Sequence, residues 1–297
     1  MAGSELSYRA HGVVLRRTKL GETDLVLTLL TEGSTQVRAV AKGARKPGAK
    51  LAGVVGLGNE ADLLLRRGRS LDIVTEGTLV VSRAGMATEL EREAVMELIL
   101  EVACELTAEG EHPVRMLPLT TTALDALAAC RTTLLPLLAG AYVLKAVAMQ
   151  GYRPVLSTCV GCGEPVELRA GERACLSFAD GGVLCEACAD AAGLSARTEA
   201  GVLGWADALV CMRFAEVLAL GSADADGADA PGTTDGCVGG LRADRPCGAS
   251  GDHGAAEACT GLAVLTFCRD WLGHFPGIRP RALDFVLSLG TFGPPAA

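Results

Sequence analysis

Residues 10–41, AHGVVLRRTKLGETDLVLTLLTEGSTQVRAVA, contain three apolar-rich runs separated by two short turn segments. The turn residues are Gly, Glu, Thr and Asp at positions 21–24 and Gly-Ser at 33–34, and the flanking runs are typical of β-strands. Residues 60–66 and 71–82 continue the pattern. Five strands in about 75 residues predict a small closed barrel such as an OB-fold rather than a seven-stranded sandwich.

The apolar pattern changes from residue 89 onward to intervals of three and four, the period of an amphipathic helix. The residues concerned are Val95, Leu98, Ile99, Val102 and Leu106. Further helices are predicted over residues 113–130, 134–150, 196–220, 259–275 and 280–289. We therefore expect an all-β OB-fold domain over residues 1–83, followed by an α-helical domain over residues 84–297.

Charge is distributed unevenly along this chain of 297 residues, whose net charge is −8. Residues 1–83 hold 13 Lys and Arg against 8 Asp and Glu, a net of +5, while the remainder holds 14 against 27, a net of −13. A basic first domain is compatible with a nucleic-acid partner despite the acidic total. No signal peptide is visible, and the apolar run 134–149 is short for a membrane span, so we expect a cytoplasmic protein.

Two C-x-x-C motifs stand 22 residues apart, Cys159 with Cys162 and Cys185 with Cys188. In a reducing compartment such a pair of motifs favours a metal site over disulfides. Four thiolates complete the tetrahedral shell of Zn²⁺ and leave no position for water, so one structural zinc ion is predicted within a module at 151–193. The alternatives are a redox-active pair and four reduced cysteines in a core.

Residues 221–258 differ in composition from the rest of the chain. Gly, Ala, Asp, Ser and Thr dominate, and large apolar residues are scarce. Such a stretch buries too little apolar surface to offset the entropy of ordering, so we predict a disordered insertion between two helices. Cys237, Cys247 and His253 lie in it at a spacing that fits no standard zinc pattern.

A second feature is the glycine-rich loop KGARKPGAK at residues 42–50, which holds four positive charges and no acid. Such a loop can follow a phosphate backbone. The predicted DNA-binding residues are Arg38, Lys42, Arg45, Lys46, Lys50 and Arg66. The alternative is a solvated loop that serves solubility. Tyr8 is the one aromatic residue in this domain, so binding through phosphates is expected rather than base stacking.

The common motifs of enzymes are absent from this sequence. The loop at residues 43–50 lacks the Gly-Lys-Ser/Thr ending of a nucleotide-binding P-loop, and neither G-x-S-x-G nor H-E-x-x-H occurs. The four histidines are interpreted as structural or surface residues. We therefore expect a protein with no catalytic residues, which binds DNA and partner proteins.

The motifs together resemble one known family. Residues 12–15, GVVL, residues 21–24, GETD, and residues 39–45, AVAKGAR, resemble the N-terminal domain of the bacterial DNA repair protein family RecO. The segments GYRP at 151–154 and FADGGVLCEAC at 178–188 resemble that family's zinc module. The insertion at residues 221–258 departs from the family pattern.

The resemblance implies an OB-fold, a helical domain and an embedded zinc module. It also implies a nucleoid-associated role in the RecF pathway of recombination: binding of single- and double-stranded DNA, annealing of complementary strands, and help in loading RecA onto SSB-coated DNA. RecR and the acidic C-terminal tail of SSB are the implied partners, and Lys42, Arg45 and Lys46 match the family's basic loop. Two alternatives remain, a zinc-ribbon adaptor in transcription or RNA metabolism and a metal-dependent nuclease.

Overall fold

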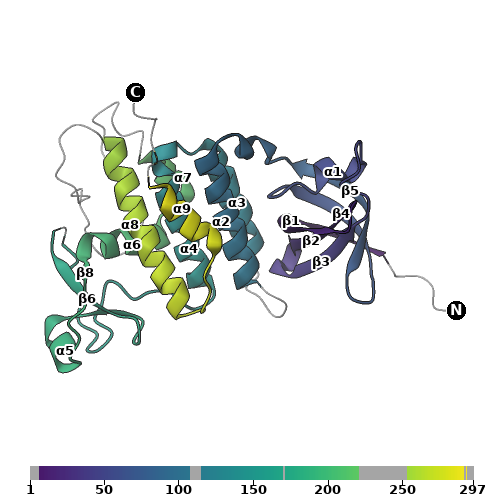
Figure 1. Cartoon of the computed structure of the whole chain (residues 1–297). Helices are drawn as coiled ribbons and strands as arrows, with labels where there is room; N and C mark the ends of the chain where they lie inside the picture. Colours follow the sequence, from purple (N-terminus) through teal and green to yellow (C-terminus); the bar gives the residue numbers. More distant parts are fainter. Residues whose placement is uncertain (1–6, 108–114, 170, 221–252, 291, 293–297) are drawn as a thin grey trace. The chain divides into compact units, whose positions relative to one another are not determined.

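The computed structural model describes residues 7–107, 115–169, 171–220, 253–290 and 292 (Figure 1). It divides into two compact units, residues 1–128 and residues 129–297. The first unit contains the barrel and two further helices, so the compact units divide later than the predicted change from strands to helices at residue 83. This division does not test the boundary at residue 83, so a DNA-binding domain over residues 1–83 and a helical domain over residues 84–297 stay predictions.

Five strands close into a barrel in the order β1-β2-β3-β5-β4, which confirms the OB-like fold (Figure 1). They are β1 (Ser7–Leu20), β2 (Asp24–Thr31), β3 (Gln36–Ala41), β4 (Glu60–Arg66) and β5 (Asp72–Val81). Strand β1 pairs with β2 through its C-terminal half and with β4 through its N-terminal half, while β3 and β5 pair in parallel. One helical turn, α1 (Lys50–Val54), lies between β3 and β4.

The barrel interior is filled by aliphatic side chains, because every second residue of each strand points inward. Leu27, Leu29 and Leu65 are buried in this cluster. Gly12 allows a close approach of strands, since a Cβ atom there would lie 2.3 Å from the backbone oxygen of Leu30. The outward-facing residues are consequently free to carry charge.

The first unit continues into two helices, α2 (Leu90–Leu106) and α3 (Met116–Ala129), which follow a short 3₁₀ turn, η2 (Ala84–Thr88). Helix α2 packs against β1, and its apolar face is buried at Val95, Leu98 and Ile99. Glu97 of this helix has a raised pKa, because it is partly buried and lies beside Glu93 and Glu101.

The second unit is built around helix α4, which contacts three of its other helices. Its helices are α4 (Leu135–Met149), α5 (Glu186–Ala191), α6 (Ala200–Cys211), α7 (Phe214–Ala219), α8 (His253–His274) and α9 (Arg281–Leu289), with a 3₁₀ turn η3 (Thr132–Leu134). Residues 132–149 are long and apolar enough to cross a membrane, but 72% of this segment is buried inside the fold. Burial to this extent is typical of a helix in the core of a folded protein.

The cysteine module adds a three-stranded sheet to the second unit, in the order β7-β6-β8. Its strands are β6 (Arg173–Ser177), β7 (Gly182–Leu184) and β8 (Arg197–Glu199). Strands β6 and β7 form a hairpin between the two C-x-x-C motifs, and Gly181 takes a left-handed φ of 80° in its turn. Phe178 in this turn packs on Trp271 of α8, with ring centroids 5.8 Å apart.

Two predictions about this part of the chain were wrong. The helix expected over residues 196–220 begins with β8, because Arg197, Thr198 and Glu199 pair with β6, and a break after Cys211 then separates α6 from α7. Helix α8 starts at His253, so residues 253–258 are helical rather than part of a disordered insertion. The rest of that insertion, with Cys237 and Cys247, lies outside the described residues.

Candidate functional site

The basic loop is held by its backbone against the turn between β1 and β2. The Asp24 carboxylate accepts the Gly43 N–H at 2.7 Å and the Thr23 hydroxyl at 2.9 Å. The Arg45 N–H donates to the Thr23 carbonyl at 2.9 Å. These bonds to the charged form lower the pKa of Asp24, with smaller contributions from Lys42 and Lys46. The loop is thus a shaped segment rather than a loose tether.

The side chains of this loop remain available. Lys42, Arg45, Lys46 and Lys50 are all exposed, and only Ala44 turns inward. The Arg45 guanidinium donates one bond, to the carbonyl of Gly21 at 3.2 Å. The part of the chain that the structure describes shows no carboxylate in a salt bridge with any of the four cations.

Arg38 and Arg66 lie on the outer surface of the barrel, both exposed. Arg66 pairs with Ile73 on β5, and Ile73 pairs with Val40 on β3, so Arg66 and Val40 share one row across three strands. Arg38 precedes Val40 by two residues and therefore points from the same face. Both arginines therefore point outward from the barrel, on β3 and β4, with β5 between them.

Arg16 was not among the predicted DNA-binding residues. In the pairing of strands Arg16 lies opposite Thr28 on β2, and Thr28 lies opposite Arg38 on β3. A bulge between Val14 and Arg16 shifts the register, so that Arg16 rather than Arg17 lies opposite Thr28. Regular alternation alone could not have identified it.

Tyr8 does not offer a stacking platform. Its hydroxyl donates to Asp72, and the Arg67 guanidinium lies 4.9 Å from the ring centroid. Burial and the Asp72 carboxylate raise the pKa of Tyr8 to about 12. With its ring beside Arg67 and its hydroxyl bonded to Asp72, Tyr8 is engaged within the protein.

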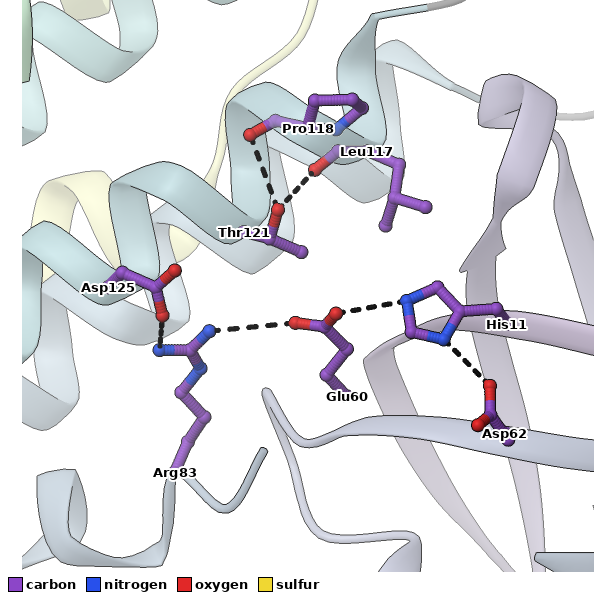
Figure 2. A network of polar contacts seen from close by, with 8 residues as sticks. All are labelled: His11, Glu60, Asp62, Arg83, Leu117, Pro118, Thr121 and Asp125. Atoms are coloured by element: carbon purple, nitrogen blue, oxygen red, sulfur yellow. Dashed lines mark hydrogen bonds and ion pairs between the residues drawn. The ribbon is translucent and has the colours of Figure 1, made fainter. Parts of the chain in front are cut away.

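A polar network joins the barrel to α3 within the first unit, as Figure 2 shows. Buried Arg83 lies 2.5 Å from Asp125 of α3 through Nη1 and 3.9 Å from Glu60 of β4 through Nη2. Its Nε and Nη2 atoms have no hydrogen-bond partner among the described residues. Glu60 in turn contacts His11 Nε2 at 2.9 Å.

His11 lies between two carboxylates at the β1–β4 pairing (Figure 2). Its Nδ1 atom is 2.8 Å from Asp62 and its Nε2 atom is 2.9 Å from Glu60. Burial alone would lower the pKa of His11, but the hydrogen bonds to Asp62 and Glu60 raise it above its usual value. This arrangement supports the structural interpretation of His11, because both ring nitrogens are engaged.

The four cysteines of the two motifs converge in the second unit. The sulfur atoms of Cys159, Cys162, Cys185 and Cys188 all lie within 4.8 Å of one another, and they could hold a metal ion. Cys162 and Cys185 are 3.8 Å apart, close to the roughly 3.8 Å between ligands of a tetrahedral Zn–S site with 2.3 Å bonds. Cys175 is buried outside the cluster, where it contacts the Leu194 carbonyl.

Local backbone shape supports this cluster. A Cβ atom at Gly161 would lie 3.1 Å from the Cys188 sulfur, and Gly163 takes a left-handed φ of 80°. The Cys185 N–H donates a hydrogen bond to the Cys159 sulfur. This bond is the main reason why the pKa of Cys159 falls to about 6. Hydrogen bonds among the thiols raise the pKa of Cys188 to about 12. Four adjacent thiols therefore cannot all ionise unless a cation compensates their charge, which fits a metal site.

Comparison with known proteins agrees with this architecture. The family model for the N-terminal part of recombination protein O matches residues 4–83, and the model for its C-terminal part matches residues 87–217. A relative from Bifidobacterium longum, named DNA repair protein RecO, is 38% identical over 183 residues, which are 61% of this chain and 73% of the relative. The chain belongs to the RecO family.

Other RecO proteins show similar agreement. The relative from Frankia casuarinae is 37% identical over 61% of this chain and 73% of its own length. The relative from Nocardioides sp. is 35% identical over 61% of this chain and 74% of its own length. The OB-like barrel, the helical part and the four-cysteine cluster of this chain agree with what the sequence motifs predicted.

Proposed function

We propose that this RecO-family protein is a DNA repair and recombination mediator of the RecF pathway that acts in the cytoplasm at the nucleoid. Residues 1–83 would form the DNA-binding domain, with Lys42, Arg45, Lys46 and Lys50 contacting phosphates. The single observation that carries the proposal is the exposed basic loop, whose backbone is fixed by Asp24 while its four cations form no salt bridge with a carboxylate of the described residues. Family membership supports the biological setting.

The mechanism follows from charge. Two complementary strands repel each other through their phosphates, and the cations of the loop, together with Arg38 and Arg66, reduce that repulsion. Because phosphate contacts leave the base edges free, pairing can proceed on the protein. Annealing therefore needs no reacting group, and we propose that the protein is not an enzyme but binds both single- and double-stranded DNA.

The four-cysteine cluster would hold one structural zinc ion through Cys159, Cys162, Cys185 and Cys188. Zinc would neutralise the thiolates and fix the module at residues 151–193 within the helical domain of residues 84–297. Closed coordination by four sulfurs supplies stability rather than chemistry. Neither motif then serves as a redox pair.

Partners extend the proposal beyond DNA. We propose that the protein binds RecR and the acidic C-terminal tail of SSB and assists the loading of RecA on SSB-coated strands. A strand-annealing assay on SSB-coated DNA, with and without RecR, tests this directly. Unchanged annealing rates on addition of the protein would contradict the mediator role.

The loop is tested by charge reversal at Arg45→Glu and Lys46→Glu. If each cation contacts one phosphate, the double variant reduces the slope of log K against log salt by about 1.4 on single strands. Fluorescence anisotropy with two unrelated sequences should show the same loss for both. Arg169→Glu, an exposed arginine of the cysteine module, is the control with unchanged affinity. Full affinity in the double variant would contradict the assignment of the loop.

A further inference from the structure

A pocket of about 390 Å³ opens on the outer surface of the barrel, beside helix α2 of the same compact unit. Its lining comes from β1, β2, β3 and α2 and contains two arginines, two threonines and a glutamine amide, but no carboxylate. The lining residues are Arg16, Thr18, Val26, Thr28, Gln36, Arg38 and Cys104. This composition is that of an anion site.

The two arginines are arranged around one point. Arg16, Thr28 and Arg38 occupy one row across three strands, with Thr28 in the middle. Adjacent strands lie about 4.8 Å apart, so the two arginine Cα atoms are about 10 Å apart and their side chains leave the same face. Both guanidinium groups can therefore reach one small group held above the nearly buried Thr28.

Neither guanidinium is held in a salt bridge by a carboxylate in the described part of the chain. Arg16 and Arg38 form no ion pair or hydrogen bond with any residue that the structure describes, whereas Arg197 and Arg213 each contact a carboxylate. Two unpaired cations on one concave surface repel each other, and an anion between them would remove that repulsion.

Helix α2 limits the size of the ligand. Gln36 donates to the Thr107 hydroxyl at 3.0 Å and to the Cys104 carbonyl, so the end of α2 is fastened to the strand beside the pocket. Glu101 and Glu105 lie close enough to Cys104 to raise its pKa, after the larger effect of burial, but they do not line the pocket. The open volume thus suits one compact anion, not a duplex.

We propose that this pocket binds a single phosphate group, at a site separate from the basic loop. The arginine forks would contact phosphate oxygens in pairs, and the hydroxyls of Thr18 and Thr28 would donate to the same group. The phosphate can belong to a single DNA strand or be free inorganic phosphate. The DNA source rests on the proposed function. Arg38 lies four residues, or about 13 Å, from Lys42 along β3, so one strand can reach both sites.

The first test uses inorganic phosphate and the full-length protein. Arginine side-chain N–H resonances are followed by NMR while phosphate replaces chloride at constant ionic strength. We expect saturable shifts for Arg16 and Arg38, lost in Arg16→Gln and in Arg38→Gln. Arg17→Gln is the matched control, since Arg17 is the next residue of the same strand and does not line the pocket.

The second test measures single-strand binding by the same variants. If the pocket holds a strand phosphate, Arg16→Gln and Arg38→Gln each weaken binding about tenfold and reduce the salt slope by about 0.7, while Arg17→Gln changes affinity less than about twofold. Phosphate shifts without an effect on DNA binding would identify free phosphate as the ligand. Neither effect, or equal effects in Arg17→Gln, would overturn the proposal.

Failure of the Arg45 and Lys46 variants to weaken DNA binding would instead refute the proposed function and leave the phosphate result standing.

Discussion

At the scale of single residues, the polar network of the first unit depends on His11. It stands between Asp62 and Glu60 of β4, and Glu60 also faces the buried Arg83, whose other partner is Asp125 of α3. A protonated imidazole interacts favourably with both carboxylates, whereas a neutral one leaves them close together with less compensation. The charge on His11 therefore influences how firmly β1 is held to β4.

This predicts a pH-dependent contribution of His11 to stability. Because the folded-state pKa of His11 is raised, the stabilisation is fully present below the unfolded value of about 6.5 and is lost as pH rises through the folded value. Amide hydrogen exchange, corrected for intrinsic rates, measures the free energy of opening of β1. In the wild type this free energy should fall as the pH rises from the unfolded pKa of His11 through its folded pKa. His11→Asn should remove the pH-dependent part. A constant difference between the two proteins would contradict the prediction.

At the scale of elements, Gly12 lies where β1 pairs with both of its neighbours, opposite Thr31 of β2 and Ala61 of β4. Gly12→Ala would place a Cβ atom 2.3 Å from the Leu30 carbonyl oxygen, so the two strands would have to separate. We expect the barrel to lose at least about 2 kcal/mol of stability.

Gly53→Ala is the matched control for that substitution. No atom lies within 4 Å of a Cβ built at Gly53, which sits in helix α1. Replacing glycine by alanine there should stabilise the helix by up to about 1 kcal/mol. Urea unfolding of the first unit, followed by hydrogen exchange of β1 and β2, measures both changes. Equal effects of the two substitutions would refute the role assigned to Gly12.

The elements that could be predicted from the sequence are those with local signals. Alternating apolar residues and glycine turns located all five barrel strands, and two adjacent C-x-x-C motifs located the metal-type cluster. Strand β8 was missed because three residues, 197–199, pair only through a neighbour about 24 positions earlier in the chain. No local period reveals such a pairing.

The candidate sites, too, were predictable only where their residues are close together in the sequence. The basic loop is contiguous and so was visible, but the row of Arg16, Thr28 and Arg38 depends on strand register and on a bulge. The contact of His11 with Glu60 likewise joins residues 49 positions apart. Long-range pairing, rather than residue type, was the missing information.

At the scale of the whole molecule, the proposed DNA contacts and the cysteine cluster lie in different compact units. Both tryptophans, Trp205 and Trp271, belong to the second unit. Trp271 is buried, donates its indole N–H to the Tyr152 carbonyl at 2.8 Å, and packs against Phe178 in the β6–β7 turn. Its fluorescence therefore reports the environment of the cysteine module and not that of the barrel.

Removal of the metal should separate the behaviour of the two units. A chelator would leave the thiols of Cys159, Cys162, Cys185 and Cys188 without a compensating cation, the module would loosen, and Phe178 would no longer shield Trp271. We expect a red shift of tryptophan emission and a lower midpoint of thermal unfolding for the second unit, reversed by added Zn²⁺. Trp271→Phe should remove most of the spectral change.

Single-strand binding through the loop of Lys42 to Lys50 should persist at low temperature, because that loop is held by Asp24 and Thr23 of its own unit. Loss of DNA binding together with the spectral shift would mean that the cysteine cluster takes part in the DNA interface.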